Sequence, residues 1–406
     1  MPGKVISGMD RSAGKVILLV DMNAFFISCE MSVNPGLKGR PAAVAGDPKS
    51  RTGIILAANY EARAFGVKTA MLVHEALSLC PGLILIPPTR GLYEKKSKEF
   101  MEILARYTPV LQKNSIDEAW LDLTGCEKLF GEPVSIAQRI MREIQYELDL
   151  WCSIGISENK FLAKMASEMK KPLGITELWK KDVPVKMWPL EIRQMYGIGS
   201  RTEERLKKIG ILTIGDLAHC DDGLLSEALG KYGRELKRLA NGIDESPVEP
   251  EPKSVTRSIS RSTTLVRDIT DMDEARTVLL SLAEEVGEEA RRSDFRGKSV
   301  QIVIRYNDFT TITRQKTITP SYLTRDIYRT GVELLGEHWD RRRPIRLLGI
   351  GISNIDDDIP VQLSIFDINE ELPDRVKKEE KLERAIDSIR SRFGSDVVKR
   401  ATLIDK

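Results

Sequence analysis

The stretch Lys15-Val-Ile-Leu-Leu-Val-Asp21 is uniformly apolar until its last residue, which is a carboxylate. A run of this length without polar alternation is typical of a strand that is covered on both faces. Residues 110–123 are predicted to form a strand, a polar turn (113–115) and a second strand. A further strand is predicted over 151–156, and a helix over about 158–170, ending before Pro172. The first part of the chain is therefore predicted to be α/β, with Asp21 at the end of a buried strand.

Composition sets the limits around this segment. The 406 residues are 41% apolar and 30% charged, and 62 basic against 60 acidic residues give a net charge of +2, which excludes a bulk polycation. No apolar run approaches the ~20 residues of a membrane span, and the first residues lack the apolar core of a signal peptide. The five cysteines and three histidines are scattered, which argues against disulfides and against a zinc site. We expect a soluble, cytoplasmic, multidomain protein.

A proline-rich break separates two parts of the chain. Residues 241–253 contain three prolines within six positions and almost no large apolar side chain, as expected of an extended linker. After it, β-rich runs are predicted at 255–265, 298–308, 310–319 and 345–355, with helices at 271–292 and 324–336. This β-α-β-β-α-β order predicts a split βαβ domain.

The second part carries its basic residues on the predicted strands and acidic residues on a predicted helix. We interpret this as a sheet with one basic face that contacts a phosphate backbone, although a solvated edge of an ordinary domain is equally compatible. The basic residues are Arg257, Arg261, Arg296, Lys298, Arg305, Arg314 and Lys316, and the acidic ones are Glu284, Glu285, Glu288 and Glu289.

Three carboxylates suggest a metal site. Asp21 ends one strand, and Asp117 and Glu118 begin another after a tight turn. Oxygen ligands without histidine or thiol suit Mg²⁺, and two such ions would offset the mutual repulsion of the acids and clamp an in-line phosphoryl displacement. Neighbouring strand residues point to opposite faces, so Asp117 and Glu118 can share one site only if the turn distorts the start of the strand.

Two further segments favour contact with phosphates. Tyr60 and Arg63 are spaced to share one face of a helix, where a hydroxyl beside a guanidinium suits a triphosphate. Residues 196–210 read as a helix-hairpin-helix in which Gly197 and Gly199 allow backbone amides to approach DNA.

Five motifs in this order resemble the Y-family (translesion) DNA polymerases, most closely the bacterial polymerase IV type, from about residue 15 to residue 367. The motifs are Val-Asp-Met-Asn-Ala-Phe-Phe (20–26), Ala-Asn-Tyr-Glu-Ala-Arg (58–63), Phe-Gly-Val-Lys (65–68), Ser-Ile-Asp-Glu-Ala (115–119) and Lys-Pro-Leu-Gly-Ile (171–175). The first of them is also similar to the polymerase V catalytic subunit, which leaves the subgroup open.

The resemblance implies a multidomain α/β and α+β fold. It comprises a ferredoxin-like palm (1–24 and 90–178), a small fingers insertion (25–89), a helical thumb with the helix-hairpin-helix (179–245), a linker (246–253) and a split-βαβ little finger (254–356). Residues 357–406 would hold a clamp-binding peptide and a charged tail.

The resemblance also implies the roles of individual residues. Asp21 and Asp117 would bridge two Mg²⁺ ions, Glu118 would stand beside the primer 3′-hydroxyl, and the Met22 carbonyl would be a further ligand. Phe25 and Phe26 would lie at the nucleotide, with Phe26 as the steric gate against a ribose 2′-hydroxyl, while Tyr60, Arg63 and Lys171 would bind the triphosphate. The chain departs from the family pattern at Asn23, Ala24 and Ala57, and Ala57 removes one expected hydrogen bond to the triphosphate.

The expected function is therefore low-fidelity, template-directed addition of deoxynucleotides to a primer, without proofreading, by a monomer. DNA would be held by Gly197, Gly199, Arg257, Arg261 and Arg305. Gln362, Leu363, Ile365 and Phe366 resemble the peptide by which bacterial polymerases dock on the sliding clamp. The alternatives are a polymerase V-like subunit that needs accessory proteins, another palm enzyme such as a cyclase or metal nuclease, and a non-catalytic DNA-binding protein.

Overall fold

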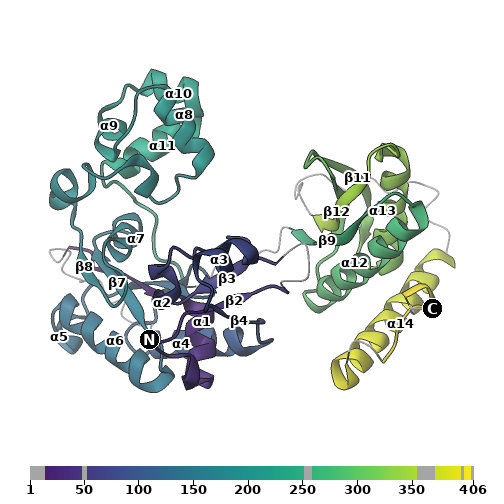
Figure 1. The fold of residues 1–406 in the computed structure, drawn as a ribbon, viewed down its shortest axis with the longest axis horizontal. Helices are drawn as coiled ribbons and strands as arrows, with labels where there is room; N and C mark the ends of the chain where they lie inside the picture. Colours follow the sequence, from purple (N-terminus) through teal and green to yellow (C-terminus); the bar gives the residue numbers. More distant parts are fainter. Residues whose placement is uncertain (1–13, 48–52, 251–257, 354–370, 395–396, 404–406) are drawn as a thin grey trace, which may run out of the picture. The chain divides into compact units, whose positions relative to one another are not determined.

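The computed structural model describes residues 14–47, 53–250, 258–353, 371–394 and 397–403 (Figure 1). The chain forms two compact units, one extending to Lys253 and the other beginning at Ser254. Arg257 and the proposed clamp peptide, Gln362 to Phe366, lie outside the described residues. Within those residues, no helix combines the length and the apolar composition needed to cross a membrane.

The first unit is built on a five-stranded sheet in the order β5-β6-β1-β7-β8. β1 lies at its centre, antiparallel to both β6 and β7. The strands are β1 (Ile17–Met22), β5 (Leu111–Lys113), β6 (Glu118–Asp122), β7 (Cys152–Ser157) and β8 (Ile175–Glu177).

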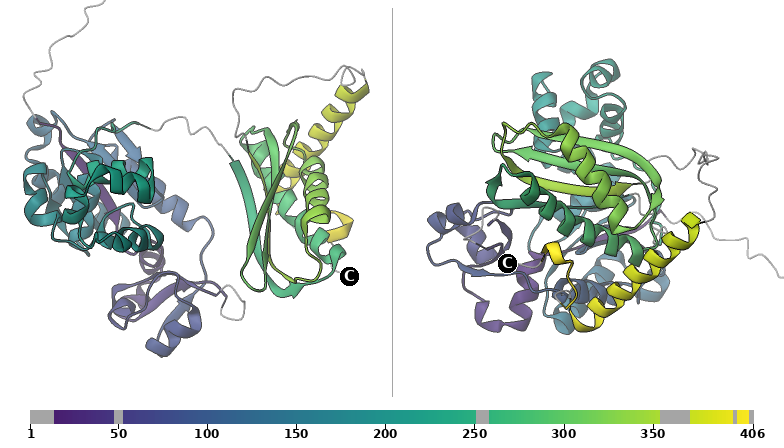
Figure 2. Two further views of the ribbon diagram at one scale, coloured as in Figure 1. Left: turned by 90° about the horizontal axis from the view of Figure 1, so that it is seen from above. Right: turned by 90° about the vertical axis from the view of Figure 1, so that its right-hand side faces the viewer.

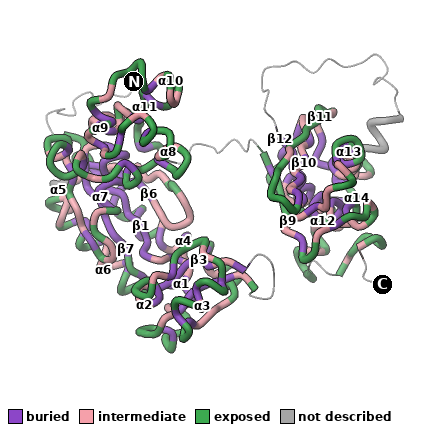
Figure 3. The backbone as a smooth tube through the Cα atoms, turned by 45° about the horizontal axis from the view of Figure 1, so that its top comes forward, coloured by how far each residue is buried: buried purple, intermediate pink, exposed green. Residues whose placement is uncertain are grey.

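Helices cover both faces of this sheet, which explains why β1 is apolar throughout. Leu18 and Val20 pack with α1, α4 and α6, whereas Ile17 and Leu19 point to the opposite face, beside Ala163 of α7. Every residue of β1 and β7 is buried (Figure 3). Helix α7 lies so close to β7 that a Cβ on Gly155 would stand 1.9 Å from the Ala163 carbonyl oxygen. The helices are α1 (Phe25–Val33), α4 (Leu92–Leu104), α5 (Glu127–Phe130), α6 (Pro133–Leu148) and α7 (Lys160–Met169).

A small sheet in the order β3-β2-β4 is inserted between α1 and α4 and has a core of its own. It consists of β2 (Ala42–Ala45), β3 (Ile55–Ala58) and β4 (Ile84–Ile86), with α2 (Tyr60–Ala64) and α3 (Val73–Leu79). The unit ends in a helical part made of α8 (Ser200–Lys208), α9 (Ile214–His219), α10 (Asp222–Leu229) and α11 (Lys231–Ala240). Short 3₁₀ and π turns complete it at Pro35–Leu37, Lys180–Asp182, Val183–Met187 and Ile192–Gln194.

The second unit confirms the predicted β-α-β-β-α-β order. Its four strands form an antiparallel sheet in the order β11-β10-β12-β9, and α12 and α13 pack on one face (Figure 2). The elements are β9 (Ser258–Ile269), α12 (Met272–Arg292), β10 (Gly297–Tyr306), β11 (Thr311–Ser321), α13 (Thr324–His338) and β12 (Ile345–Ser353).

The interpretation that this sheet has one basic face is wrong. Arg261 shares the strand parity of the core residues Ile259 and Leu265 and pairs with Glu285 and Glu289 of α12, at 3.7 and 3.8 Å. Lys316 likewise faces the helices and pairs with Glu333 at 2.5 Å. The acidic helices therefore neutralise basic residues at the sheet edges instead of standing behind a charged sheet.

The face turned away from the helices carries small and hydroxyl side chains. On β9 and β12, Ser260 and Ser262 are paired with Gly351 and Gly349. Arg305 of the neighbouring strand β10 is paired with Leu347 of β12. A shallow groove of about 240 Å³ runs along it. Of the three arginines predicted to contact DNA, Arg305 belongs to this open face, and its Nε donates to Thr311 Oγ1 at 3.0 Å.

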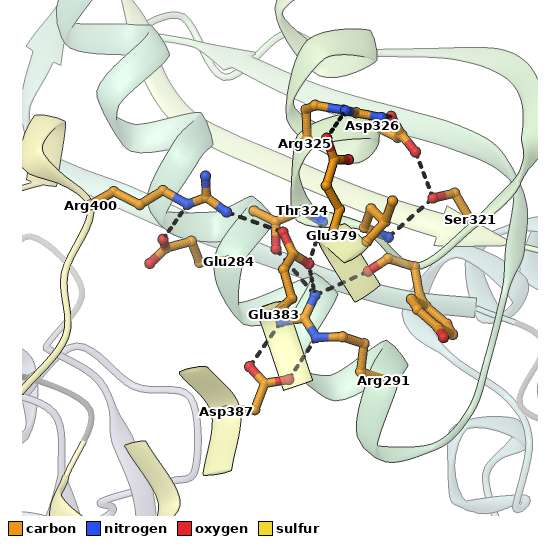
Figure 4. A network of polar contacts seen from close by, with 12 residues as sticks. Glu284, Arg291, Ser321, Thr324, Arg325, Asp326, Glu379, Glu383, Asp387 and Arg400 are labelled. Atoms are coloured by element: carbon orange, nitrogen blue, oxygen red, sulfur yellow. Dashed lines mark hydrogen bonds and ion pairs between the residues drawn. The ribbon is translucent and has the colours of Figure 1, made fainter. Parts of the chain in front are cut away.

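The charged tail packs against the second unit through ion pairs, as α14 (Glu371–Phe393; Figure 4). Arg291 of α12 is buried, donates to Glu383, and makes two hydrogen bonds to Asp387 at 2.6 and 2.9 Å. Glu383 also accepts from the Thr324 amide and from Arg400, both at 3.1 Å. Because this interface is ionic, the sequence contains no apolar periodicity that would predict it.

We predict that Glu383→Ala destabilises the attachment of α14. Removing Glu383 leaves the buried Arg291 with Asp387 as its remaining carboxylate partner, takes the acceptor from the Thr324 amide, and should lower the free energy of local unfolding by about 3 kcal/mol. Hydrogen–deuterium exchange would show this as lost protection of α14 and of the end of α12. The matched control is Arg384→Ala, which removes an exposed pair with Asp294 at 3.3 Å from the same helix and should change protection little. Equal protection in Glu383→Ala and the wild type would contradict the prediction.

Candidate active site

A sharp turn after β1 sets the position of the site. Ala24 adopts the left-handed conformation (φ 48°) and immediately precedes α1. Asn23 is buried, donates to Ser153 Oγ at 3.0 Å and accepts from the Leu173 amide at 3.0 Å. This amide ties β1 to β7 and to the segment before β8, so the departure from the family pattern at Asn23 has a structural role here.

The turn before β6 resolves the difficulty that neighbouring residues should face opposite ways. Asp117 precedes the strand, its backbone carbonyl accepts from the Met22 amide at 3.0 Å, and its side chain accepts from Ser115 Oγ at 2.5 Å. Glu118 begins the strand and is paired in register with Asp21. Both carboxylates consequently line the same cavity as Asp21.

An acidic cluster lies at the end of β1. Oxygen atoms of Asp21, Glu118 and Glu168 lie within 4.8 Å of one another, which is close enough to hold a metal ion. The Lys164 ammonium lies among them, at 2.8 Å from Asp21, 2.6 Å from Glu118 and 2.8 Å from Glu168. Lys171 adds contacts of 2.9 Å to both Asp21 and Glu168. Three carboxylates and two ammonium groups leave a formal charge of −1 at this point.

Burial and charge act against each other on the pKa values of these groups. Burial raises the pKa of Asp21 despite the nearby Lys164 and Lys171. Burial also disfavours ionised Glu118, but its hydrogen bonds to Asp21 and Lys164 outweigh burial, so its pKa is lowered. For Lys164, burial would lower the pKa, yet Asp21 and Glu168 hold it above its ordinary value, so the side chain stays protonated.

A cavity of about 370 Å³ brings together the predicted residues of the first unit. Its lining includes Asp21, Met22, Phe25, Phe26, Tyr60, Arg63, Asp117, Glu118 and Lys171. Phe25 is only 4% exposed and belongs mainly to the core, whereas Phe26 is half-buried and presents its ring to the cavity.

Hydrogen-bond donors line the same cavity as the acids. The Tyr60 hydroxyl is buried without a hydrogen-bond partner among the described residues, and burial raises its pKa. The Arg63 guanidinium carbon lies 5.1 Å from the centre of the Tyr60 ring. A buried hydroxyl that lacks an acceptor, beside two cations, fits an anionic ligand better than an apolar one.

The glycine turn predicted in the helical part is present outside this cavity. Gly197 has φ +93°, a conformation that favours glycine, and Gly199 caps the N-terminus of α8. Tyr232 donates to the Gly197 carbonyl at 2.8 Å and holds the turn against α11. Among the described residues no side chain caps the N-terminus of α8, so the amides of its first turn can bind an anion.

The sequence analysis did not identify Lys164 and Glu168. They occupy positions i and i+4 of α7, on one helical face, and Lys171 follows just after the helix has ended. Several lysines lie near the end of this helix, and the sequence does not show which of them faces the sheet, because that depends on how the helix packs.

The fold and the site define a palm-type nucleotidyltransferase, with carboxylates on a central sheet, a helix-hairpin-helix and a separate βαββαβ unit. The impB/mucB/samB family model matches residues 20–168, the model of that family's C-terminal domain matches residues 256–365, and the IMS family HHH motif matches residues 180–211. The chain belongs to this family, the Y-family DNA polymerases.

Similar proteins agree along nearly the whole chain. A protein of Clostridium kluyveri named DNA polymerase IV is 54% identical over 97% of this chain and 99% of its own length. DNA polymerase IV 1 of Bacillus subtilis is 39% identical over 100% of this chain and 95% of its own length. A solved Y-family DNA polymerase chimera of Dbh and Dpo4 superposes with a TM-score of 0.75 at 27% identity, covering 84% of this chain and 98% of the chimera.

We predict that Lys164→Met makes the stability of the first unit depend on a divalent cation. Without the ammonium, Asp21 and Glu118 lose a buried partner, which should cost about 3 kcal/mol. Thermal unfolding in EDTA should show a clear fall in Tm that excess Mg²⁺ partly reverses. The control Lys170→Met changes an exposed lysine at the end of the same helix and should leave Tm unchanged in both conditions. A Lys164→Met variant as stable as the control in EDTA would contradict the prediction.

Proposed function

We propose that this chain is a low-fidelity DNA-directed DNA polymerase that adds deoxynucleotides to a primer 3′ end, releases pyrophosphate, and acts in translesion synthesis without a proofreading exonuclease. The observation that supports the proposal best is the single cavity that joins Asp21, Asp117 and Glu118 to Tyr60, Arg63 and Lys171 in a chain of the Y-family. Carboxylates and hydrogen-bond donors in one cavity are what a nucleoside triphosphate and its metal ions require.

The carboxylates of the cavity fit Mg²⁺, because every ligand atom that they offer is an oxygen. Asp21, Asp117 and Glu118, with the Met22 carbonyl, would hold two ions, and Glu168 lies close enough to contribute. Bound there, the ions would neutralise charge on the phosphates and lower the pKa of the primer hydroxyl. Lys164 occupies the same oxygens, so its ammonium and a metal ion compete for them.

The remaining lining residues position the nucleotide. Tyr60 would donate its buried hydroxyl to the triphosphate, and Arg63 and Lys171 would balance the phosphate charge. Phe26 would lie under the deoxyribose and leave no room for a 2′-hydroxyl. Such positioning supplies much of the rate in phosphoryl transfer, since little covalent chemistry is required of the protein.

DNA would be held at two places outside the cavity. The Gly197–Gly199 turn would direct amides at the start of α8 toward a phosphate. The open face of the second unit, with its serines, glycines and Arg305, would lie along the duplex. Arg257 and Arg261 stay candidate contacts, since Arg261 also lines this groove while it pairs with Glu285 and Glu289 of α12.

Other properties belong to the same proposal. The chain would work as a monomer in the cytoplasm and dock on the sliding clamp through Gln362, Leu363, Ile365 and Phe366. A cyclase or a metal nuclease would have less use for a helix-hairpin-helix and a separate βαββαβ unit. A non-catalytic DNA-binding protein would not need the carboxylates of the cavity.

We predict that Asp117→Asn and Glu118→Gln each abolish nucleotide incorporation while DNA binding persists. Loss of a carboxylate that holds the metal should reduce kcat/KM by roughly 1000-fold or more. The matched control is Asp122→Asn, at the far end of the same strand. Extension within about tenfold of the wild type by both variants, measured in single-turnover assays, would remove these residues from the mechanism.

We predict that Arg305→Ala weakens binding to DNA of every sequence and flattens its salt dependence by about one unit of slope. Lys316→Ala, on the opposite side of the sheet and paired with Glu333, serves as the control and should leave the slope unchanged. Fluorescence anisotropy of labelled primer-template across a salt series gives both slopes. Equal slopes for the two variants would show that Arg305 does not contact the DNA backbone.

A further inference from the structure

The ring of Phe26 is stacked on a second aromatic residue. Its centroid lies 4.4 Å from that of Tyr93 in α4, with an angle of 25° between the planes. Tyr93 is buried, so one face of the Phe26 ring is covered by a side chain that has no free space to move. Phe26 belongs both to the cavity lining and to this stack.

A buried carboxylate fixes the position of Tyr93. The Tyr93 hydroxyl donates to Glu30 Oε1 at 2.6 Å, and Glu30 is only 5% exposed. Glu30 also accepts from the amide and the hydroxyl of Thr89, both at 3.2 Å. Burial raises the pKa of the Tyr93 hydroxyl, which therefore remains a donor. The Glu30 side chain therefore holds the Tyr93 ring in one position.

The spacing on α1 gives this arrangement its geometry. Phe26 and Glu30 are four residues apart and lie on one face of the helix. Tyr93 bridges them, with its ring against Phe26 and its hydroxyl on Glu30. Thr89 lies in the segment that leads from β4 of the small sheet back to α4, so the same carboxylate also ties that connection to α1.

We propose that Glu30 and Tyr93 form a brace that fixes the Phe26 ring and thereby sets how strongly the enzyme discriminates against ribonucleotides. The inference rests on the proposed function, in which Phe26 excludes the 2′-hydroxyl. A ring can exclude one oxygen atom only if it cannot turn or retreat by about an ångström, and misplacement on that scale changes rates by as much as 100-fold. Tyr93 and Glu30 are positioning residues here, since they act on the sugar through Phe26.

The test measures kcat/KM for a deoxynucleotide and for its ribonucleotide in the wild type and in variants of the brace. Tyr93→Leu removes the stack, and the ratio of the two constants should fall by about tenfold. Tyr93→Phe keeps the ring but removes the hydroxyl, and Glu30→Gln keeps an acceptor of the same size, so both should lower the ratio less. The ratio does not depend on the fraction of folded enzyme, so partial unfolding cannot imitate the result.

The control is Tyr107→Phe, which alters another buried tyrosine that packs on Phe130 in the same core. Its ratio should equal that of the wild type. Phe26→Ala separates the two claims. If Phe26→Ala leaves the ratio unchanged, Phe26 does not exclude the 2′-hydroxyl, and the proposed role of Glu30 and Tyr93 is overturned as well. If Phe26→Ala relaxes sugar selection but Tyr93→Leu does not, the brace alone is overturned.

Discussion

Negative charge buried at the end of β1 is the constraint on which the rest of the active site depends. Asp21 is only 4% exposed and stands within a few ångströms of Glu118 and Glu168. Such a group is stable only if cations compensate it, because an unpaired buried charge costs several kcal/mol. Lys164 and Lys171 supply that compensation in this structure, and both belong to α7 or the residues just after it.

This compensation links the fold to the chemistry. Helix α7 must pack tightly on β7 to bring Lys164 to the acids, and Gly155 is the residue that permits the approach. The Asn23 side chain then fixes the turn that carries Phe25 and Phe26 away from the same strand end. The elements α1, β6 and α7 therefore converge on the last residues of β1. This convergence brings the acids, the cations and the Phe26 ring into one cavity.

Part of this arrangement could be predicted from the sequence, and the reasons for success and failure are physical. The uniform apolar run of β1 predicted a strand buried on both faces. The alternation of strand and helix patterns in the sequence predicted the β-α-β-β-α-β order of the second unit. Lys164 and Glu168 were missed because helical register against a sheet depends on tertiary packing. The attachment of α14 was missed because ion pairs leave no hydrophobic pattern. The single basic face could have been rejected from the sequence, since the parity of Arg261 with Ile259 and Leu265 already indicated the helix side of the sheet.

We have assigned the carboxylates at the end of β1 to template-directed nucleotide addition by this chain. Primer extension by the purified chain alone, on an undamaged primer-template with all four deoxynucleotides and Mg²⁺, tests it most directly. We expect incorporation that follows the template and stops when EDTA is added. A chain that binds the primer-template normally but incorporates no nucleotide in the presence of Mg²⁺ would contradict it.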